Sequence, residues 1–173
     1  SWPKLEWFDG KVQFSQGIDK SKVIYTPWAS GGSALFNRQI WDKLGGLDEI
    51  YAPWYWEDID IGYRAWKSGY KIIWDPSSKV DHNHESTSKK LDQYKVSTIK
   101  QRNELLFNWL NITDKNLFIG HLKYLVSYSF SHPGYLRIIF TAIIRRISTR
   151  TVTRNFVYSD ANTIKLFSSS YEN

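Results

Sequence analysis

The chain contains no cysteine among its 173 residues. Neither a disulfide framework nor a zinc site with cysteine ligands can form, which is compatible with a reducing compartment such as the cytoplasm. Methionine is also absent, and the chain begins at Ser1. Because natural chains normally start with methionine, we expect a segment of a longer protein. The sequence has no glycine-rich loop of the Gly-x-Gly-x-x-Gly or Walker type, which excludes the common phosphate-binding loops.

Apolar and aromatic side chains are abundant. Hydrophobic residues make up 42% of the chain, aromatic residues 17% and charged residues 23%, a composition that favours a folded core over disorder. Residues 1–86 carry 10 Lys and Arg against 12 Asp and Glu, whereas residues 87–173 carry 13 against 5. A basic half can bind nucleic acid, but long apolar runs interrupt these cations and no nucleic-acid-binding module is recognisable. We therefore expect no nucleic-acid partner.

A single helix is predicted directly after Trp56. Ile59, Tyr63 and Trp66 recur at the spacing of one helical face, and Gly69 supplies a stop signal. The strand-like run 70–74 follows. The pattern therefore predicts an amphipathic helix that opens on a cluster of carboxylates.

The carboxylates at the start of this helix are candidates for acid–base chemistry. Glu57 and Asp58 fall in the first turn, where the positive end of the helix favours the ionised form that a general base needs. Asp60 and Arg64 are four residues apart, so we expect them to pair along the helix surface. This pairing leaves Asp58 as the freer carboxylate. The alternative is that these acids are ordinary capping residues.

Three aromatic residues precede the acids. The rings of Trp54, Tyr55 and Trp56 offer flat apolar faces with polar edges, which suit the faces and hydroxyls of a sugar. Aromatic residues before a helix are also common in protein cores. The segment therefore indicates a saccharide-binding surface, either in an enzyme or in a carbohydrate-binding module without catalysis.

Several short blocks occur in a fixed order along the chain: 31–38 (GGSALFNR), 44–49 (LGGLDE), 56–64 (WEDIDIGYR), 69–72 (GYKI), and 80–82 (VDH) with 86–87 (ST). Residues 102–107 (RNELLF) extend the set to about residue 110. This ordered set resembles the second half of a family 2 glycosyltransferase. The nearest resemblance is to the rhamnosyltransferase-like enzymes that build bacterial and archaeal surface polysaccharides.

The resemblance implies a GT-A fold, a mixed α/β sheet that binds a nucleotide-sugar and a divalent metal, Mg²⁺ or Mn²⁺. It implies inverting transfer to a saccharide or lipid-linked saccharide, with Asp58 as the general base and Glu57 beside it. His82 matches a family histidine that contacts the metal or the diphosphate, and His84 is the alternative. Gly31 and Gly32 permit close approach of a sugar or of a neighbouring strand.

The pattern Asp58-Ile59-Asp60 is not the metal-binding Asp-x-Asp motif of GT-A enzymes. That motif ends an apolar strand, whereas these acids open a helix after a Pro- and aromatic-rich loop. We therefore expect the true motif upstream of this chain and little transferase activity from the chain alone. The expected organisation is an acceptor and catalytic half over residues 1–86, a basic helical extension over 87–155, and a fraying polar tail over 156–173.

Further elements are predicted from local patterns. Residues 22–25 and 34–36 indicate strands, residues 39–44 a short helix, and residues 88–110 and 117–130 longer helices that end at a break over 131–134. Residues 1–17 resemble a variable loop of the same family. The apolar run 135–147 is too short and too charged to span a membrane.

An amphipathic helix over residues 135–154 is a candidate for binding a membrane surface. Its arginines would meet anionic headgroups, which would place the protein on the cytoplasmic face of a membrane. The alternative is that the helix packs on its neighbours and its arginines are solvated. The arginines concerned are Arg137, Arg145, Arg146, Arg150 and Arg154.

Overall fold

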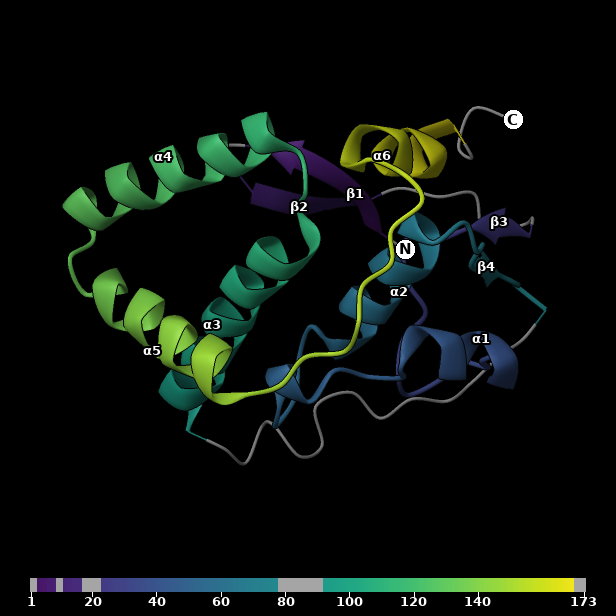
Figure 1. Ribbon diagram of the computed structural model, residues 1–173, viewed down its shortest axis with the longest axis horizontal. Helices are drawn as coiled ribbons and strands as arrows, with labels where there is room; N and C mark the ends of the chain where they lie inside the picture. Colours follow the sequence, from purple (N-terminus) through teal and green to yellow (C-terminus); the bar gives the residue numbers. More distant parts are fainter. Residues whose placement is uncertain (1–2, 9–10, 17–22, 78–91, 170–173) are drawn as a thin grey trace.

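A computed structural model describes residues 3–8, 11–16, 23–77 and 92–169 of the chain (Figure 1). The described residues are mostly helical, with two small two-stranded sheets. The elements in chain order are β1 (Pro3–Phe8), β2 (Lys11–Gln16), β3 (Ile24–Tyr25), α1 (Arg38–Leu44), the 3₁₀ helix η1 (Glu49–Tyr51), α2 (Glu57–Lys67), β4 (Ile73–Trp74), α3 (Gln93–Asn111), α4 (Lys115–Ser131), α5 (Tyr135–Ser148) and α6 (Asp160–Ser169).

The strands form two antiparallel pairs. β1 pairs with β2 from Pro3 opposite Gln16 to Phe8 opposite Lys11, so the segment expected to be a variable loop is a hairpin. β3 pairs with β4, with Ile24 opposite Trp74. The expected mixed sheet is not seen among the described residues, although two short sheets beside helices are compatible with part of an α/β domain.

Two strand predictions need correction. Residues 34–36 are not a strand but lead into α1, where Asn37 accepts hydrogen bonds from the amides of Gln39 and Ile40 and thereby caps the helix. The predicted strand 70–74 is reduced to its last two residues. Short apolar runs are ambiguous on their own, and at residues 34–36 the capping side chain directs the backbone into a helix.

The ends of α1 and α2 agree with the predictions. Gly45 ends α1 with φ +79°, and Gly69 follows α2 with φ +86°. Both angles lie in the left-handed region, which glycine adopts without the steric penalty of a side chain. The two glycines therefore fix where α1 and α2 stop.

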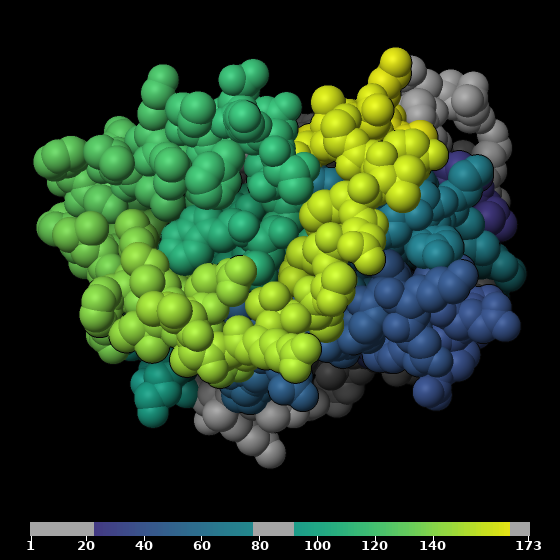
Figure 2. All heavy atoms as spheres, viewed as in Figure 1, coloured from purple at the N-terminus to yellow at the C-terminus, as the bar shows by residue number. Residues whose placement is uncertain are grey.

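Helix α2 differs from the prediction in its environment. Every residue from Asp60 to Lys67 is buried, so the polar face expected in solvent is covered. Asp60 and Arg64 do pair, at 2.6 Å, but with side chains 0% and 1% exposed. The expected surface ion pair is therefore an interior one, because the segment between α5 and α6 runs across α2 (Figures 1 and 2).

Residues beyond 155 were expected to be a fraying tail, but they contain the ordered helix α6. The amides of Val157 and Tyr158 donate to the carbonyl of Lys67 at 2.8 and 2.9 Å. Asp160 is buried and pairs with the Lys67 ammonium at 2.7 Å. Asp160 thereby fastens the start of α6 to α2.

The glycine at position 62 allows α2 to pack closely on the preceding loop. A Cβ at Gly62 would lie 2.7 Å from the Cβ of Trp28 and 2.8 Å from the carbonyl oxygen of Pro27. Trp66, one turn later, donates from its indole to the carbonyl of Thr26 at 2.9 Å. Any side chain at position 62 would push this loop away from the helix.

Helix α3 occupies the centre of the molecule. α2 and α5 pack on it, and α4 and α5 form a hairpin at one end (Figure 1). Its residues Leu105, Leu106 and Phe107 are fully or almost fully buried. The described helices include none with the length and apolar character needed to cross a bilayer. The buried core draws on α2, α3, α4, α5 and η1: Ile50, Tyr51, Tyr63, Trp66, Leu105, Leu106, Phe107, Ile112, Leu125, Ile138 and Ala142.

Candidate active site around Asp58

Asp58 lies in the first turn of α2 and is half-buried. One carboxylate oxygen accepts from the Ile59 amide at 2.8 Å, and the other accepts from the Gly31 amide at 3.4 Å. Within the described part of the chain no Lys or Arg forms an ion pair with it. The structure therefore brings together Asp58 and Gly31, two residues that the sequence predicted for the site, and leaves the carboxylate without a countercharge.

Burial raises the pKa of Asp58 above its usual range, while the amides of Gly31 and Ile59 act in the opposite direction. Burial also raises the pKa of Glu57, and the neighbouring Asp58 charge adds to this rise. The helix start was expected to favour the ionised form of these acids, but desolvation outweighs it. A carboxylate with a raised pKa is a stronger proton acceptor once it is ionised.

Asp60 has a different environment from Asp58. Its side chain is fully buried, and both of its oxygens are used within the fold. An acid held in this way has no lone pair directed at a substrate and serves the fold. Four side chains donate to it: Arg64 (2.6 Å), Asn111 (2.7 Å), Tyr51 (2.8 Å) and Arg154 (3.2 Å).

Two buried polar atoms within four residues of Asp58 in the sequence have no partner among the described residues. They are the indole nitrogen of Trp54, a donor, and one carboxylate oxygen of Glu57, an acceptor. Buried polar groups are almost always hydrogen-bonded in folded proteins. A hydroxyl group can both donate and accept, so an unpaired donor and an unpaired acceptor suit a ligand rich in hydroxyls.

The aromatic segment before α2 has a strained backbone. Tyr55 and Trp56 have φ values of +71° and +79°, a region that bulky residues rarely adopt and that costs about 1–3 kcal/mol per residue. Such strain persists only where surrounding contacts enforce it and is concentrated at functional sites. This local geometry is consistent with a binding segment.

The three rings of this segment have different surroundings. The Trp56 ring packs on Phe107 with centroids 5.2 Å apart and belongs partly to the core. The ammonium of Lys100 lies 4.3 Å from the centroid of the Tyr55 ring. The alternative interpretation, that these aromatic residues belong to the core, therefore applies in part to Trp56. The indole nitrogen of Trp54, in contrast, has no hydrogen-bond partner among the described residues.

The residues that hold this segment were not predicted from the sequence. Asn103 of α3 donates from its amide nitrogen to the carbonyls of Tyr51, Trp54 and Tyr55 at 2.7, 3.0 and 2.8 Å. Arg102 donates to the carbonyl of Ala52 at 2.6 Å. The sequence does contain a signal for Asn103. Position 103 lies one and two helical turns before the buried residues 107 and 111, so it falls on the same buried face of α3. A polar side chain on that face needs a hydrogen-bond partner inside the protein.

The expected metal ligand cannot be placed. His82 and His84 lie outside the described residues, and Gly32 forms part of an exposed turn with Gly31. Across the described residues no group of three or more His, Cys, Asp or Glu side chains could hold a metal ion. The part of the chain that the structure describes therefore contains no such metal-binding cluster, and the metal contact expected at His82 stays a prediction.

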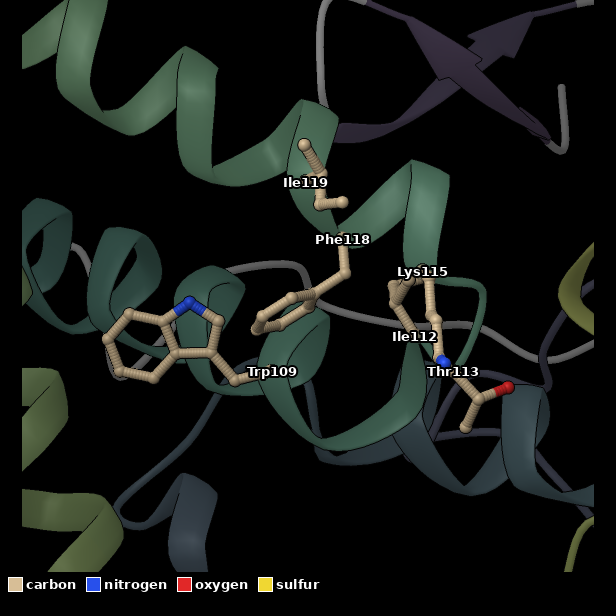
Figure 3. Close-up of a pocket in the computed structure, with 6 residues that line it drawn as sticks. All are labelled: Trp109, Ile112, Thr113, Lys115, Phe118 and Ile119. Atoms are coloured by element: carbon tan, nitrogen blue, oxygen red, sulfur yellow. The ribbon is translucent and has the colours of Figure 1, made fainter.

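Two hollows are found elsewhere, and neither is lined by Asp58. The first lies where the end of α3 meets the start of α4, with Phe118 of α4 directed toward Trp109 of α3 (Figure 3). The second lies beside the end of α5 and shares Trp109 with the first. The candidate site at Asp58 is thus separate from both hollows.

Comparison with known proteins gives a partial relationship. The chain is 39% identical over 82 residues, 47% of its length, to N-acetylglucosaminyl-diphospho-decaprenol L-rhamnosyltransferase of Mycobacterium tuberculosis, of which this covers 25%. It is 30% identical over 70 residues to polypeptide N-acetylgalactosaminyltransferase 3 of Homo sapiens (40% of this chain, 11% of that protein). It is 27% identical over 88 residues to the Drosophila melanogaster protein of the same name (49% and 13%).

The chain therefore spans about a quarter or less of the length of these curated relatives. No family model and no solved structure matches it. The predicted resemblance to family 2 glycosyltransferases is confirmed as a partial relationship.

Proposed function

From this partial relationship to family 2-like glycosyltransferases, we propose that the chain forms the acceptor side of a glycosyltransferase. The reaction would transfer a sugar from a nucleotide-sugar donor to a hydroxyl of a saccharide or lipid-linked saccharide, with inversion at the anomeric carbon. The proposal rests on one observation: Asp58 is half-exposed and without a countercharge among the described residues, whereas Asp60 two residues later is sealed by two arginines.

In this mechanism Asp58 accepts the proton of the acceptor hydroxyl. The hydroxyl oxygen attacks the anomeric carbon, the bond from that carbon to the diphosphate breaks, and the electron pair leaves with the nucleotide. The Gly31 amide, 3.4 Å from the carboxylate, orients Asp58, and burial raises its pKa and hence its basicity. One carboxylate is sufficient for inversion.

In this proposal the unpaired atoms of Trp54 and Glu57 recognise the acceptor. The indole nitrogen would donate to one sugar oxygen, and the Glu57 carboxylate would accept from a sugar hydroxyl. Asn103 holds the segment that carries Trp54 through three carbonyls. The acceptor contacts would therefore sit on a segment fixed to the central helix.

A divalent metal, Mg²⁺ or Mn²⁺, would neutralise the leaving diphosphate. Since the described residues hold no group that fits such an ion, we assign it to the donor side, with His82 as a candidate contact. No Asp-x-Asp ending an apolar strand occurs in the chain, so we expect the 173 residues alone to bind acceptor without turnover. Proton transfer to Asp58 does not require a metal ligand from α2.

The test is Asp58→Asn in a full-length protein that contains this chain. The amide keeps the shape of the side chain but cannot accept the proton, so we expect kcat to fall by about 10²–10⁴-fold while acceptor affinity, measured by NMR titration, changes little. Asp42→Asn is the matched control, because Asp42 pairs with Arg38 on the exposed surface of α1. Turnover by Asp58→Asn within a factor of two of wild type would refute the base assignment.

The alternative function, a carbohydrate-binding module, predicts a different pattern. The full-length protein would bind saccharide through Trp54 without consuming any nucleotide-sugar, and Asp58→Asn would leave binding intact. Release of the nucleotide, followed with a panel of nucleotide-sugars, separates the two functions.

A further inference from the structure

The segment that contains α4 and α5 has an unusual charge content. Residues 115–159 include no Asp or Glu, but they include seven basic residues. Both helices lie wholly within this segment. A net charge of +7 over 45 consecutive residues makes this part of the surface attractive to anions.

Helix α4 exposes one apolar face. Ile119, Leu122, Val126 and Phe130 are spaced three or four residues apart and are all exposed, with Phe130 86% accessible. This spacing places their side chains on one side of the helix. Residues of a water-facing helix are normally polar on that side, so the exposed face lacks a partner within the described chain.

Helix α5 repeats the pattern. Ile138 and Ala142 are buried in the core, and α5 packs on α3. The outer face carries five exposed apolar residues, and Ile147 is 79% accessible. They are Leu136, Phe140, Ile143, Ile144 and Ile147.

Two hollows that share Trp109 lie beside these helices. Trp109 of α3 lines one hollow with Phe118 and Ile119 of α4, and a second with Ile143 and Ile147 of α5. In Figure 2 atoms of α3 form the floor between α4 and α5. Trp109 thus lines hollows beside both helices, and apolar side chains of α4 and α5 line these hollows with it.

The cations of the segment divide into two groups. Arg145 donates to the carbonyls of Glu49 and Ile50, and Arg154 pairs with Asp48 and Asp60. These two arginines stabilise the fold, so the prediction that they contact lipid headgroups is wrong. The other five are exposed: Lys115, Lys123, Arg137, Arg146 and Arg150.

We propose that the α4–α5 hairpin is a docking surface for an anionic lipid bilayer, on which it lies in the plane of the interface. Apolar side chains on the outer faces would enter the headgroup region, and the five exposed cations would meet lipid phosphates. This extends the predicted membrane segment, residues 135–154, to include α4.

Charge favours a bilayer over a second copy of the chain. A symmetric dimer would place the same patch on both subunits, so it would bring two sets of exposed cations together. Residues 115–159 offer no acid to neutralise them. An anionic bilayer covers the apolar faces and neutralises the cations at the same time.

The test is co-sedimentation of the chain with phosphatidylcholine vesicles, with and without phosphatidylglycerol. We expect binding to the anionic vesicles, weak binding to the neutral ones, and loss of binding at high salt. Arg146→Glu with Arg150→Glu should lower partitioning by at least roughly 30-fold, because each lost surface cation costs about a factor of five and the added carboxylates are repelled by the anionic bilayer. Lys43→Glu with Lys165→Glu makes the same charge change on α1 and α6 and should have a much smaller effect.

The apolar contribution is tested separately. Phe130→Ser with Phe140→Ser should weaken binding to anionic vesicles, while Leu35→Ser, at a residue 101% exposed near α1, should not. The four test positions and the three control positions are all exposed, and far-UV circular dichroism checks that each variant folds. Equal binding of wild type and both surface variants would overturn the proposal, and so would a stable dimer by analytical ultracentrifugation that Phe130→Ser with Phe140→Ser dissociates.

Discussion

The buried carboxylate of Asp160 allows a direct test of how α6 is attached to α2. It is fully buried and lies 2.7 Å from the equally buried ammonium of Lys67. It also accepts from the hydroxyl of Tyr63 at 2.8 Å and from the amides of Thr113 and Asp114 at 2.8 and 2.7 Å. Asp160 therefore joins α2, the α3–α4 junction and α6 at one point.

We expect Asp160→Ala to destabilise the fold strongly. Removing one partner of a buried ion pair costs about 3–5 kcal/mol, because the other charge stays buried without compensation. Lys67 keeps two hydrogen bonds, to the carbonyl of Asn111 and the hydroxyl of Thr113, so the lower end of this range applies. A loss of about 3 kcal/mol lowers the melting temperature by roughly 6–12 °C in a domain of this size.

The assay is thermal unfolding followed by circular dichroism, with Asp160→Ala compared with the double variant Lys67→Met with Asp160→Ala. The double variant removes the uncompensated charge and should recover part of the lost stability. Asp42→Ala, which breaks an exposed ion pair on α1, is the control and should change little. A melting temperature for Asp160→Ala within one degree of wild type would show that the pair does not hold α6.

The same group predicts an acid sensitivity. The Lys67 partner and the hydrogen bonds lower the pKa of Asp160 despite its burial. Because the folded pKa lies below the unfolded one, the stabilisation is complete above the unfolded value, about 3.9, and is lost as the pH falls through the folded pKa. Urea unfolding midpoints should therefore fall with acid in wild type more steeply than in Asp160→Asn.

Three further predictions concern α2, α3 and α4. Gly62→Ala should lower the free energy of unfolding in urea by about 1–3 kcal/mol, because the added Cβ would overlap the loop that precedes α2. Gly120→Ala is the matched comparison: open space surrounds this residue, so the change should raise the free energy of unfolding by roughly 0.5–1 kcal/mol. Asn103→Ala should weaken acceptor binding in NMR titrations by freeing three carbonyls; unchanged affinity would contradict this. The acid limb of the kcat/KM profile should lie above the usual Asp range and disappear in Asp58→Asn.

Local signals were sufficient to predict where α1 and α2 end and where α4 and α5 separate. Gly45 and Gly69 mark the ends of α1 and α2, and the break at 131–134 separates α4 from α5. These signals act within a few residues, through left-handed backbone angles or the missing amide of proline. These signals therefore do not depend on how distant parts of the chain pack.

Long-range pairing could not be predicted in the same way. Lys67 and Asp160 are 93 residues apart, and Asp48 and Arg154 are 106 apart. From its neighbours in the sequence alone, a charged residue at any of these positions is expected to be solvent-exposed. The partners meet only because the segment between α5 and α6 runs across α2. For the same reason α6 was expected to fray, although Asp160 fastens its first turn.

The contrast between Asp58 and Asp60 shows where prediction stops. Successive residues of an α-helix are turned by about 100°, so two carboxylates two residues apart lie on nearly opposite sides, and this much follows from the spacing. Which side is open depends on Arg154, 94 residues away, which closes over Asp60. The choice of Asp58 as the base thus gains its support from the segment that covers the other carboxylate.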